Sequence, residues 1–223
     1  CGFFIPISIL TSNISEFSDL SKLITLTPVL WNTMMVASLG STVIVTVATF
    51  LACTTVVNGD KKLQHFASIS AMGYAFPGTM LAIGVLIIAG LVDQTLGGTL
   101  FFSNESSQTY FISGTLVVLI FAYLVRFLAV GYGAALSGLS RISTNLNWAS
   151  RTLSNSFSNT IISVSIPLIK KSIIAGGLLA FVDIIKELPM TLLLRPFNFE
   201  TLATYTYQFA HDEMMEQAAL PAL

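Results

Sequence analysis

The stretch 28–57 contains no charged residue, and this single feature limits the folds open to the chain. It exceeds the roughly 18 apolar residues that indicate a helix able to cross a bilayer. Its many threonines and valines would favour a β-strand in water. In lipid an open strand leaves its backbone groups unpaired, so a helix is favoured instead. The run therefore predicts a membrane-spanning helix.

The composition of the whole chain supports a lipid environment. Of the 223 residues, 54% are hydrophobic and only 9% are charged, whereas soluble domains carry roughly 25% charged residues. The mean hydropathy is +0.80. No basic patch is present, so nucleic acid is excluded as a partner. The two cysteines suggest neither a disulfide framework nor a metal site, and Cys53 is predicted to be a small packing residue.

Further apolar runs complete an all-α transmembrane fold of about four or five spans. The predicted spans are 28–57, 66–92, 110–130 and 167–187, and residues 1–10 resemble the end of another span. Lys61 and Lys62 lie in the short connection 58–65, which places that connection in the cytoplasm. The same orientation makes 137–166 cytoplasmic. Because the sequence begins and ends in apolar stretches, we expect it to be part of a longer membrane protein.

Prolines mark two positions in these spans. Pro28 is expected in the first turn of its helix, where a missing N–H costs nothing. Pro77-Gly78 falls in the middle of 66–92 and predicts a kink. The kink has two interpretations, a hinge lining a pathway or a bend that serves packing.

The third run carries one charge, and two small residues on one helical face follow it. Arg126 is expected near the inner end of 110–130, where its long side chain reaches the headgroups. Beyond it, Ala134 and Gly138 are four residues apart on one helical face, which allows another helix to approach closely.

Residues 145–160 predict an amphipathic helix on the cytoplasmic side. Its apolar residues recur at three- and four-residue spacing, and its polar residues lie largely off that stripe; the apolar positions are Leu146, Ala149, Leu153 and Phe157. Such a helix either docks into a groove on a soluble partner or rests on the bilayer surface. The chain is expected to turn at Pro167 and then to cross the membrane outward.

A charged cluster closes this outward crossing. Lys171 to Lys186 spans roughly 22 Å of helix, less than a bilayer core of roughly 30 Å. Asp183, Lys186 and Glu187 are therefore predicted within membrane depth, on a shared helical face. One interpretation is a translocation path in which a carboxylate transiently binds a hard cation. The other is a structural Asp183–Lys186 pair that fixes the turn at Pro189.

Residues 145–207 resemble ABC importer permeases. The cytoplasmic signature of that family is a Glu-Ala-Ala triplet, a Gly, and an Ile-x-Leu-Pro ending. Here Trp148-Ala149-Ser150 stands at the triplet, Ser154 at the glycine and Val164-Ser165-Ile166-Pro167 at the ending. The downstream sequence VDIIKELPMTLLLRPFNFETLATYTYQ is similar to the C-terminal half of ferric-iron permeases. Trp148 and Ser154 depart from the signature, which puts in doubt the strength of the contact with an ATPase.

The resemblance implies a type I importer permease, a helical bundle of the maltose-permease kind in a bacterial inner membrane. Its implied partners are ABC ATPase subunits, an extracytoplasmic solute-binding protein and the other permease half. ATP and Mg²⁺ would be bound by the ATPase, since this chain has no GxxxxGK[ST] loop and no expected cofactor. The residues implied in coupling to the ATPase are Trp148, Ala149, Ser150, Leu153, Ser154, Phe157 and Pro167.

Two other functions remain open at this point. One is a secondary transporter or channel, in which the charged cluster binds the ion and the amphipathic helix lies on lipid. The other is an ABC permease for another solute, such as thiamine, sulfate or a polyamine. The adjacent His211, Asp212 and Glu213 give no firm metal site.

Overall fold

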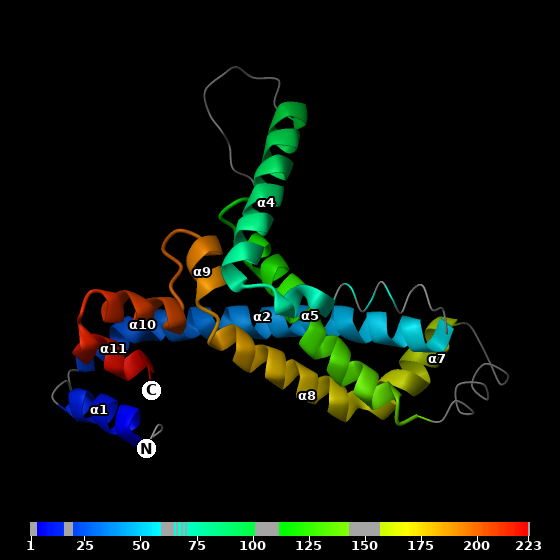
Figure 1. The fold of residues 1–223 in the computed structure, drawn as a ribbon, viewed down its shortest axis with the longest axis horizontal. Coiled ribbons are helices and arrows are strands. Elements are labelled where there is room, and N and C mark those ends of the chain that lie inside the picture. Colours follow the sequence, from blue (N-terminus) through cyan, green and yellow to red (C-terminus); the bar gives the residue numbers. More distant parts are fainter. Residues whose placement is uncertain are drawn as a thin grey trace. The chain divides into compact units, whose positions relative to one another are not determined.

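The computed structural model describes residues 4–15, 20–58, 65, 67, 69, 71–100, 112–142 and 157–222, and within these ranges the chain contains helices and no strand (Figure 1). The predicted all-α class is confirmed. Besides a short 3₁₀ segment at Ala71–Ala75 and a π-helical segment at Ile161–Ser165, the α-helices are α1 (Phe4–Ser15), α2 (Leu20–Asn58), α4 (Gly78–Leu100), α5 (Leu116–Leu139), α7 (Phe157–Thr160), α8 (Ile166–Ile185), α9 (Pro189–Leu194), α10 (Leu202–His211) and α11 (Met215–Ala222).

Three of these helices are long and apolar enough to cross a membrane among the residues searched, namely Leu26–Val56, Gly78–Thr95 and Leu116–Leu139. They correspond to the first three predicted spans. The fourth, predicted over 167–187, forms α8, which carries Lys170, Lys171 and Asp183 within its length. Its crossing of the membrane stays a prediction.

The helix boundaries differ from the predicted ones at each proline in these spans. Helix α2 begins at Leu20, so Pro28 lies inside it and not in its first turn. The predicted kinked helix over 66–92 is wrong, because a 3₁₀ segment ends at Ala75 and α4 starts only at Gly78. Proline disfavours the α conformation in the residue before it, and here that restriction separates two elements where a single bent helix was expected.

Helix α5 continues to Leu139, beyond the predicted end at residue 130. Arg126 is consequently a mid-helix residue, with ten helical residues before it and thirteen after it. At 1.5 Å per residue, roughly 15 Å and 20 Å of helix separate it from the two ends. The prediction that Arg126 lies near the inner end of its helix is therefore wrong.

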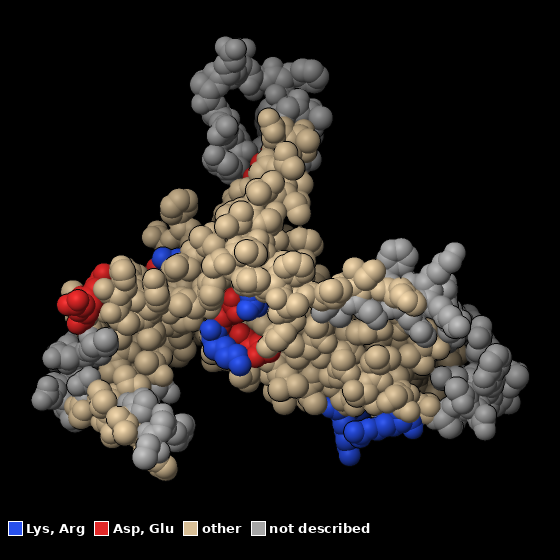
Figure 2. Space-filling model, in the orientation of Figure 1, with Lys and Arg blue, Asp and Glu red and all other residues tan. Residues whose placement is uncertain are grey.

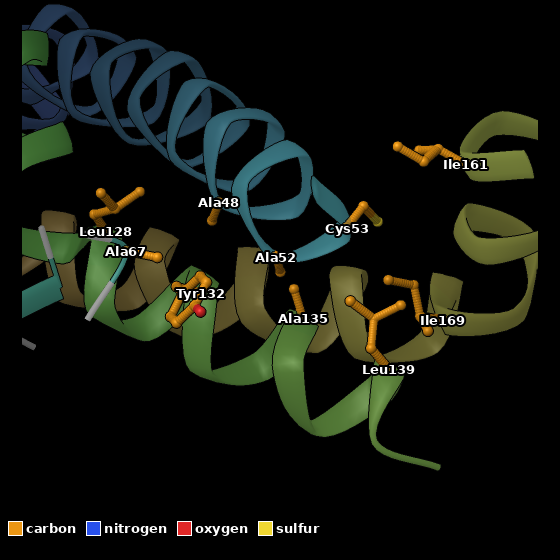
Figure 3. Close-up of a cluster of buried hydrophobic side chains, with 10 residues drawn as sticks. All are labelled: Ala48, Ala52, Cys53, Ala67, Leu128, Tyr132, Ala135, Leu139, Ile161 and Ile169. Carbon is orange, nitrogen blue, oxygen red and sulfur yellow. The ribbon is translucent and has the colours of Figure 1, made fainter. Parts of the chain in front are cut away.

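The chain divides into two compact units. Unit 1 comprises Cys1–Ala37, Ala82–Leu119 and Ile185–Leu223, and unit 2 comprises Ser38–Leu81 and Ile120–Ile184. In unit 2, the portions of α2, α5 and α8 that belong to this unit contribute to a cluster of buried hydrophobic side chains (Figure 3). Its members are Ala48, Ala52, Cys53, Ala67, Leu128, Tyr132, Ala135, Leu139, Ile161 and Ile169. Cys53 is fully buried there, which confirms its predicted packing role.

Close contact between α5 and α8 depends on small residues. A Cβ atom added at Gly176 would lie 2.7 Å from the Cβ of Ala134, and one added at Gly138 would lie 2.8 Å from Ser172 Oγ. Real Cβ atoms do not approach so closely, so both positions need glycine. The predicted close-packing face at Ala134 and Gly138 is confirmed, and α8 is the helix that covers it.

In unit 1, α11 packs against both α10 and α1. The start of α10 is tied to α2 by two hydrogen bonds. Leu202 N donates to Thr33 Oγ1 over 2.9 Å, and Asn32 Nδ2 donates to the carbonyl oxygen of Glu200 over 3.2 Å. Residues separated by most of the sequence are thus joined at the N-terminal part of α2.

The candidate coupling segment and charged segment

Most of the predicted coupling helix lies outside the described residues. These positions are Trp148, Ala149, Ser150, Leu153 and Ser154. Phe157 is the first residue of α7, which ends at Thr160. The assignment of this segment to an ATPase contact therefore stays a prediction.

The expected turn at Pro167 is absent, since the helical backbone runs through it. Residues Ile161–Ser165 form a π-helical segment between α7 and α8. Thr160 and Ile166, which flank it, are both in the right-handed helical region, and Ile166 N donates to the carbonyl oxygen of Ile161. Pro167 is the second residue of α8 and is exposed. Local π adjustment is one of the ways by which membrane helices accommodate proline, and here it replaces the expected turn.

The charged segment straddles the end of α8. Asp183 is a half-buried residue of that helix, Lys186 is an exposed residue of the following turn, and Glu187 is buried with 7% of its surface exposed. Because α8 ends at Ile185, the argument that all three share one helical face does not hold. A new helix begins at Pro189, where the missing N–H of proline suits a first helical position, while Leu188 itself keeps right-handed helical angles.

Glu187 accepts hydrogen bonds from two residues at the start of α9. Its Oε1 accepts a long hydrogen bond of 3.5 Å from Met190 N, and its carbonyl oxygen accepts one of 2.6 Å from Thr191 Oγ1. Met190 and Thr191 are fully buried. A carboxylate at a helix N-terminus also interacts favourably with the helix dipole. In the structure it is Glu187 that contacts the residues following Pro189.

Charge of both signs is concentrated around the end of α8. Figure 2 shows blue and red side chains together over the C-terminal end of this helix, on a surface that is otherwise mostly uncharged. The opposite end of α8 carries only cations among its described charges, the exposed Lys170 and Lys171. This asymmetry agrees with an inner end facing anionic headgroups.

A second polar cluster follows α9, within the stretch 145–207 for which the sequence analysis predicts a resemblance to permeases. Arg195 forms an ion pair with Glu200, and its Nη1 also donates to the carbonyl oxygen of Phe199 over 3.4 Å. The other Glu200 oxygen accepts from Thr204 Oγ1 over 2.9 Å. Thr201 and Thr204 form a reciprocal capping box at the start of α10. Sequence reasoning recognised this stretch only by resemblance; the Thr-x-x-Thr spacing was the available structural signal.

The polar cluster also affects its neighbour Tyr205. Burial and, secondarily, the negative charge of Glu200 raise the pKa of Tyr205 above its ordinary value of 10.0. Tyr205 is therefore an uncharged phenol at neutral pH. Its ring lies 4.6 Å from that of Phe209, centroid to centroid, so the aromatic face of α10 remains apolar.

Replacing Thr33 with valine tests the tie between α2 and α10. We expect a loss of about 1–3 kcal/mol in the free energy of unfolding, because valine keeps the shape of threonine while Leu202 N loses its acceptor. The matched control is Thr46→Val on the same helix, where the exposed hydroxyl donates only to its own helix at Thr42. Thermal unfolding of the purified protein in detergent measures both. Equal midpoints for the two variants would contradict the role given to Thr33.

The described residues contain no group of three or more His, Cys, Asp and Glu side chains suited to a metal ion. The described carboxylates near the end of α8 are Asp183 and Glu187. Contact between either carboxylate and a passing cation stays a prediction.

The sequence and the fold of the chain are each similar to those of known transport proteins. No protein-family model matches the chain. Over 155 residues it is 25% identical to the ferric transport system permease protein FbpB of Actinobacillus pleuropneumoniae, a match that covers 70% of this chain and 20% of that protein. The chain thus spans only a fifth of the length of this curated relative.

The fold is similar to that of a chain in the crystal structure of a bacterial alginate ABC transporter, solved in complex with an alginate pentasaccharide-bound periplasmic protein. The TM-score is 0.76 over 99% of this chain and 81% of the other, with 14% sequence identity. At that identity the likeness concerns the fold alone. The chain therefore has the fold of an ABC transporter permease, and over 155 residues its sequence is similar to that of one ferric transport permease.

Proposed function

We propose that this chain is part of the permease of an ATP-driven importer of ferric iron in a bacterial inner membrane. The observation that carries the proposal is agreement between two independent likenesses. The fold match extends over 99% of the chain, and the sequence match names a ferric transport permease. The hydrogen-bonded cluster Arg195–Thr204 gives a structural role to residues of the stretch that resembles ferric-iron permeases.

In this proposal, one part of the chain contacts the ATPase and another part forms the pathway. Segment 145–160 would contact an ATPase subunit and transmit its ATP-driven closure to α8 through the helical backbone of 157–166. Helices α2, α4, α5 and α8 would line or surround the pathway, which opens alternately to a solute-binding protein outside and to the cytoplasm. In this arrangement the ATPase supplies the energy, and this chain supplies the path.

Reconstitution into liposomes tests the proposal. The complete transporter, with its co-encoded ATPase, is supplied with a co-encoded solute-binding protein loaded with radioactive ferric iron. We expect uptake with ATP and none with a non-hydrolysable analogue. Uptake driven by an ion gradient without ATP would indicate a secondary transporter, and ATP-driven uptake of thiamine, sulfate or a polyamine in place of iron would assign a different cargo.

Glu187→Gln tests whether this carboxylate contacts the cargo. The substitution keeps an oxygen for Met190 N and removes the negative charge, so α9 should fold normally. We expect uptake to fall by about tenfold, or about 1.4 kcal/mol, with an unchanged amount of protein in the membrane. The matched control is Glu213→Gln, on an exposed residue beyond α10. Normal uptake by Glu187→Gln at normal abundance would remove Glu187 from the pathway.

Trp148→Ala tests the coupling segment. If this position contacts the ATPase, we expect ATP-dependent uptake to fall by about tenfold, because truncating a large aromatic contact commonly costs 2 kcal/mol or more. Co-purification of the ATPase with the permease should fall in parallel. Phe197→Ala is the control, an aromatic truncation at a residue that is 100% exposed and lies outside the segment. An unchanged yield of ATPase would contradict the assignment.

A further inference from the structure

The mid-helix position of Arg126 raises the question of what neutralises its charge. Its side chain is half-buried, and its Nε atom is buried. The guanidinium carbon lies 5.7 Å from the centre of the Phe127 ring, so part of its surroundings is aromatic. Charged groups at such a depth in a membrane normally face another helix and pair with an opposite charge.

The composition of unit 2 leaves few candidates for that opposite charge. Across 38–81 and 120–184, the acidic residues in the sequence are Asp60 and Asp183. Asp60 follows α2, which ends at Asn58, and the preceding span ends at Val56. Asp183 is therefore the carboxylate of unit 2 that lies within a long helix, as Arg126 does.

The register between α5 and α8 places these two residues opposite each other. Gly138 on α5 meets Ser172 on α8, and Ala134 meets Gly176. Moving four residues toward the start of α5 therefore corresponds to moving four residues toward the end of α8, as expected for antiparallel helices. Moving eight residues further from the Ala134–Gly176 contact in the same way places Arg126 opposite Ile184, the neighbour of Asp183.

An independent contact shows that the two helices are still close together at this level. A Cβ atom added at Gly40 on α2 would lie 2.9 Å from Ile184 Cδ1 and 3.6 Å from Tyr123 Cδ2. Ile184 adjoins Asp183 in α8, and Tyr123 is three residues, or about one turn, from Arg126 in α5. Both helices therefore reach the same point on α2.

We propose that Arg126 and Asp183 form an ion pair that fastens α5 to α8 in the membrane interior. The pair continues the contact made by Ala134, Gly138 and Gly176, so that α5 and α8 move as one body. Asp183 then serves to hold the helices together and is not a ligand for cargo. The inference rests on packing within unit 2 and does not depend on the identity of the transported solute.

The test is a set of charge variants in the complete transporter, measured in membranes. Arg126→Gln and Asp183→Asn each leave one charge without its counterpart at membrane depth. We expect each to lower the amount of folded protein by at least about tenfold, since breaking a buried pair is strongly destabilising. The double variant R126Q/D183N and the exchange R126D/D183R should each recover most of the loss. Arg141→Gln, on an exposed residue beyond the end of α5, is the control for loss of a cation.

A cysteine pair gives a direct measure of proximity that does not need the charged single variants to fold. In a background without Cys1 and Cys53, R126C/D183C removes both charges together, and we expect a bifunctional maleimide, whose reach matches that of the two long side chains, to cross-link it. L139C/I169C is the positive control, because both side chains belong to the same buried cluster and neither replaces a glycine. Cross-linking of the control without cross-linking of the 126/183 pair would overturn the proposal. So would single variants that accumulate normally, or losses that simply multiply in the double variant.

Discussion

Gly73→Ala is expected to destabilise the protein by about 3 kcal/mol or more, the upper end for overpacking a buried site. A Cβ atom added at Gly73 would lie 2.1 Å from the carbonyl oxygen of Val125 and 3.0 Å from its carbonyl carbon. These are backbone atoms of α5, so no rotamer change can relieve the collision. The 3₁₀ segment at Ala71–Ala75 would have to move away from α5. A lower thermal midpoint and a lower yield of folded protein would report this.

Two glycines of α4 provide the control for Gly73→Ala. Added Cβ atoms at Gly84 and Gly90 would have no atom within 4 Å. Alanine at either position should raise the free energy of unfolding by about 0.5–1 kcal/mol, because glycine is less favourable than alanine inside a helix. If Gly73→Ala behaves like these two variants, the close approach of the 3₁₀ segment to α5 is not present in the folded protein.

Asp93→Asn is expected to destabilise unit 1 by about 3 kcal/mol, because it affects two hydrogen bonds to a charged group, each worth about 1.5–3 kcal/mol. Asp93 Oδ1 accepts from Ile112 N over 2.7 Å, and Oδ2 accepts from Ser113 N over 2.9 Å. The carboxylate is buried, with 6% of the residue exposed. An asparagine presents one oxygen and one N–H₂ group, so one of the two backbone donors would face another donor.

The consequence of Asp93→Asn should be local. Asp93 joins α4 to the residues that precede α5, so protease cleavage between α4 and α5 should become faster while the unit 2 core remains protected. Gln94→Ala is the control, on an exposed residue next to Asp93 in the same helix. Equal cleavage rates in the two variants would show that Asp93 does not hold the connection.

Much of the fold was predictable because it depends on composition. The absence of charge over 28–57 and 66–92 leaves only helix as a structure compatible with lipid. The glycine and alanine spacing in α5 correctly predicted a close helix contact. Boundaries were less predictable, since α5 runs to Leu139 through the polar and glycine-rich residues after residue 130. Tertiary contacts with α8 stabilise that extension, and local sequence does not reveal them.

The contacts of the candidate site were less predictable, because they also depend on tertiary structure. Asp93 directly follows the predicted span 66–92, and only the fold brings the backbone of Ile112 and Ser113 to its carboxylate. Arg126 was interpreted as a headgroup contact, because its depth depends on where α5 ends. Glu187 was recognised as unusual from its charge. Its contacts with Met190 and Thr191 required knowledge that α8 stops at Ile185.

The π-helical segment at Ile161–Ser165 has a consequence for how related chains can vary in length. Each residue of an α-helix turns the chain by about 100°, and a π segment accommodates one residue more than the α-helix would. Because the π segment holds this extra residue within a turn, deleting a single residue here would convert the segment to α-helix and leave α7 and α8 facing nearly the same way. A one-residue insertion or deletion is therefore absorbed at this position without turning α7 about its axis and without changing the contacts that α8 makes with α5.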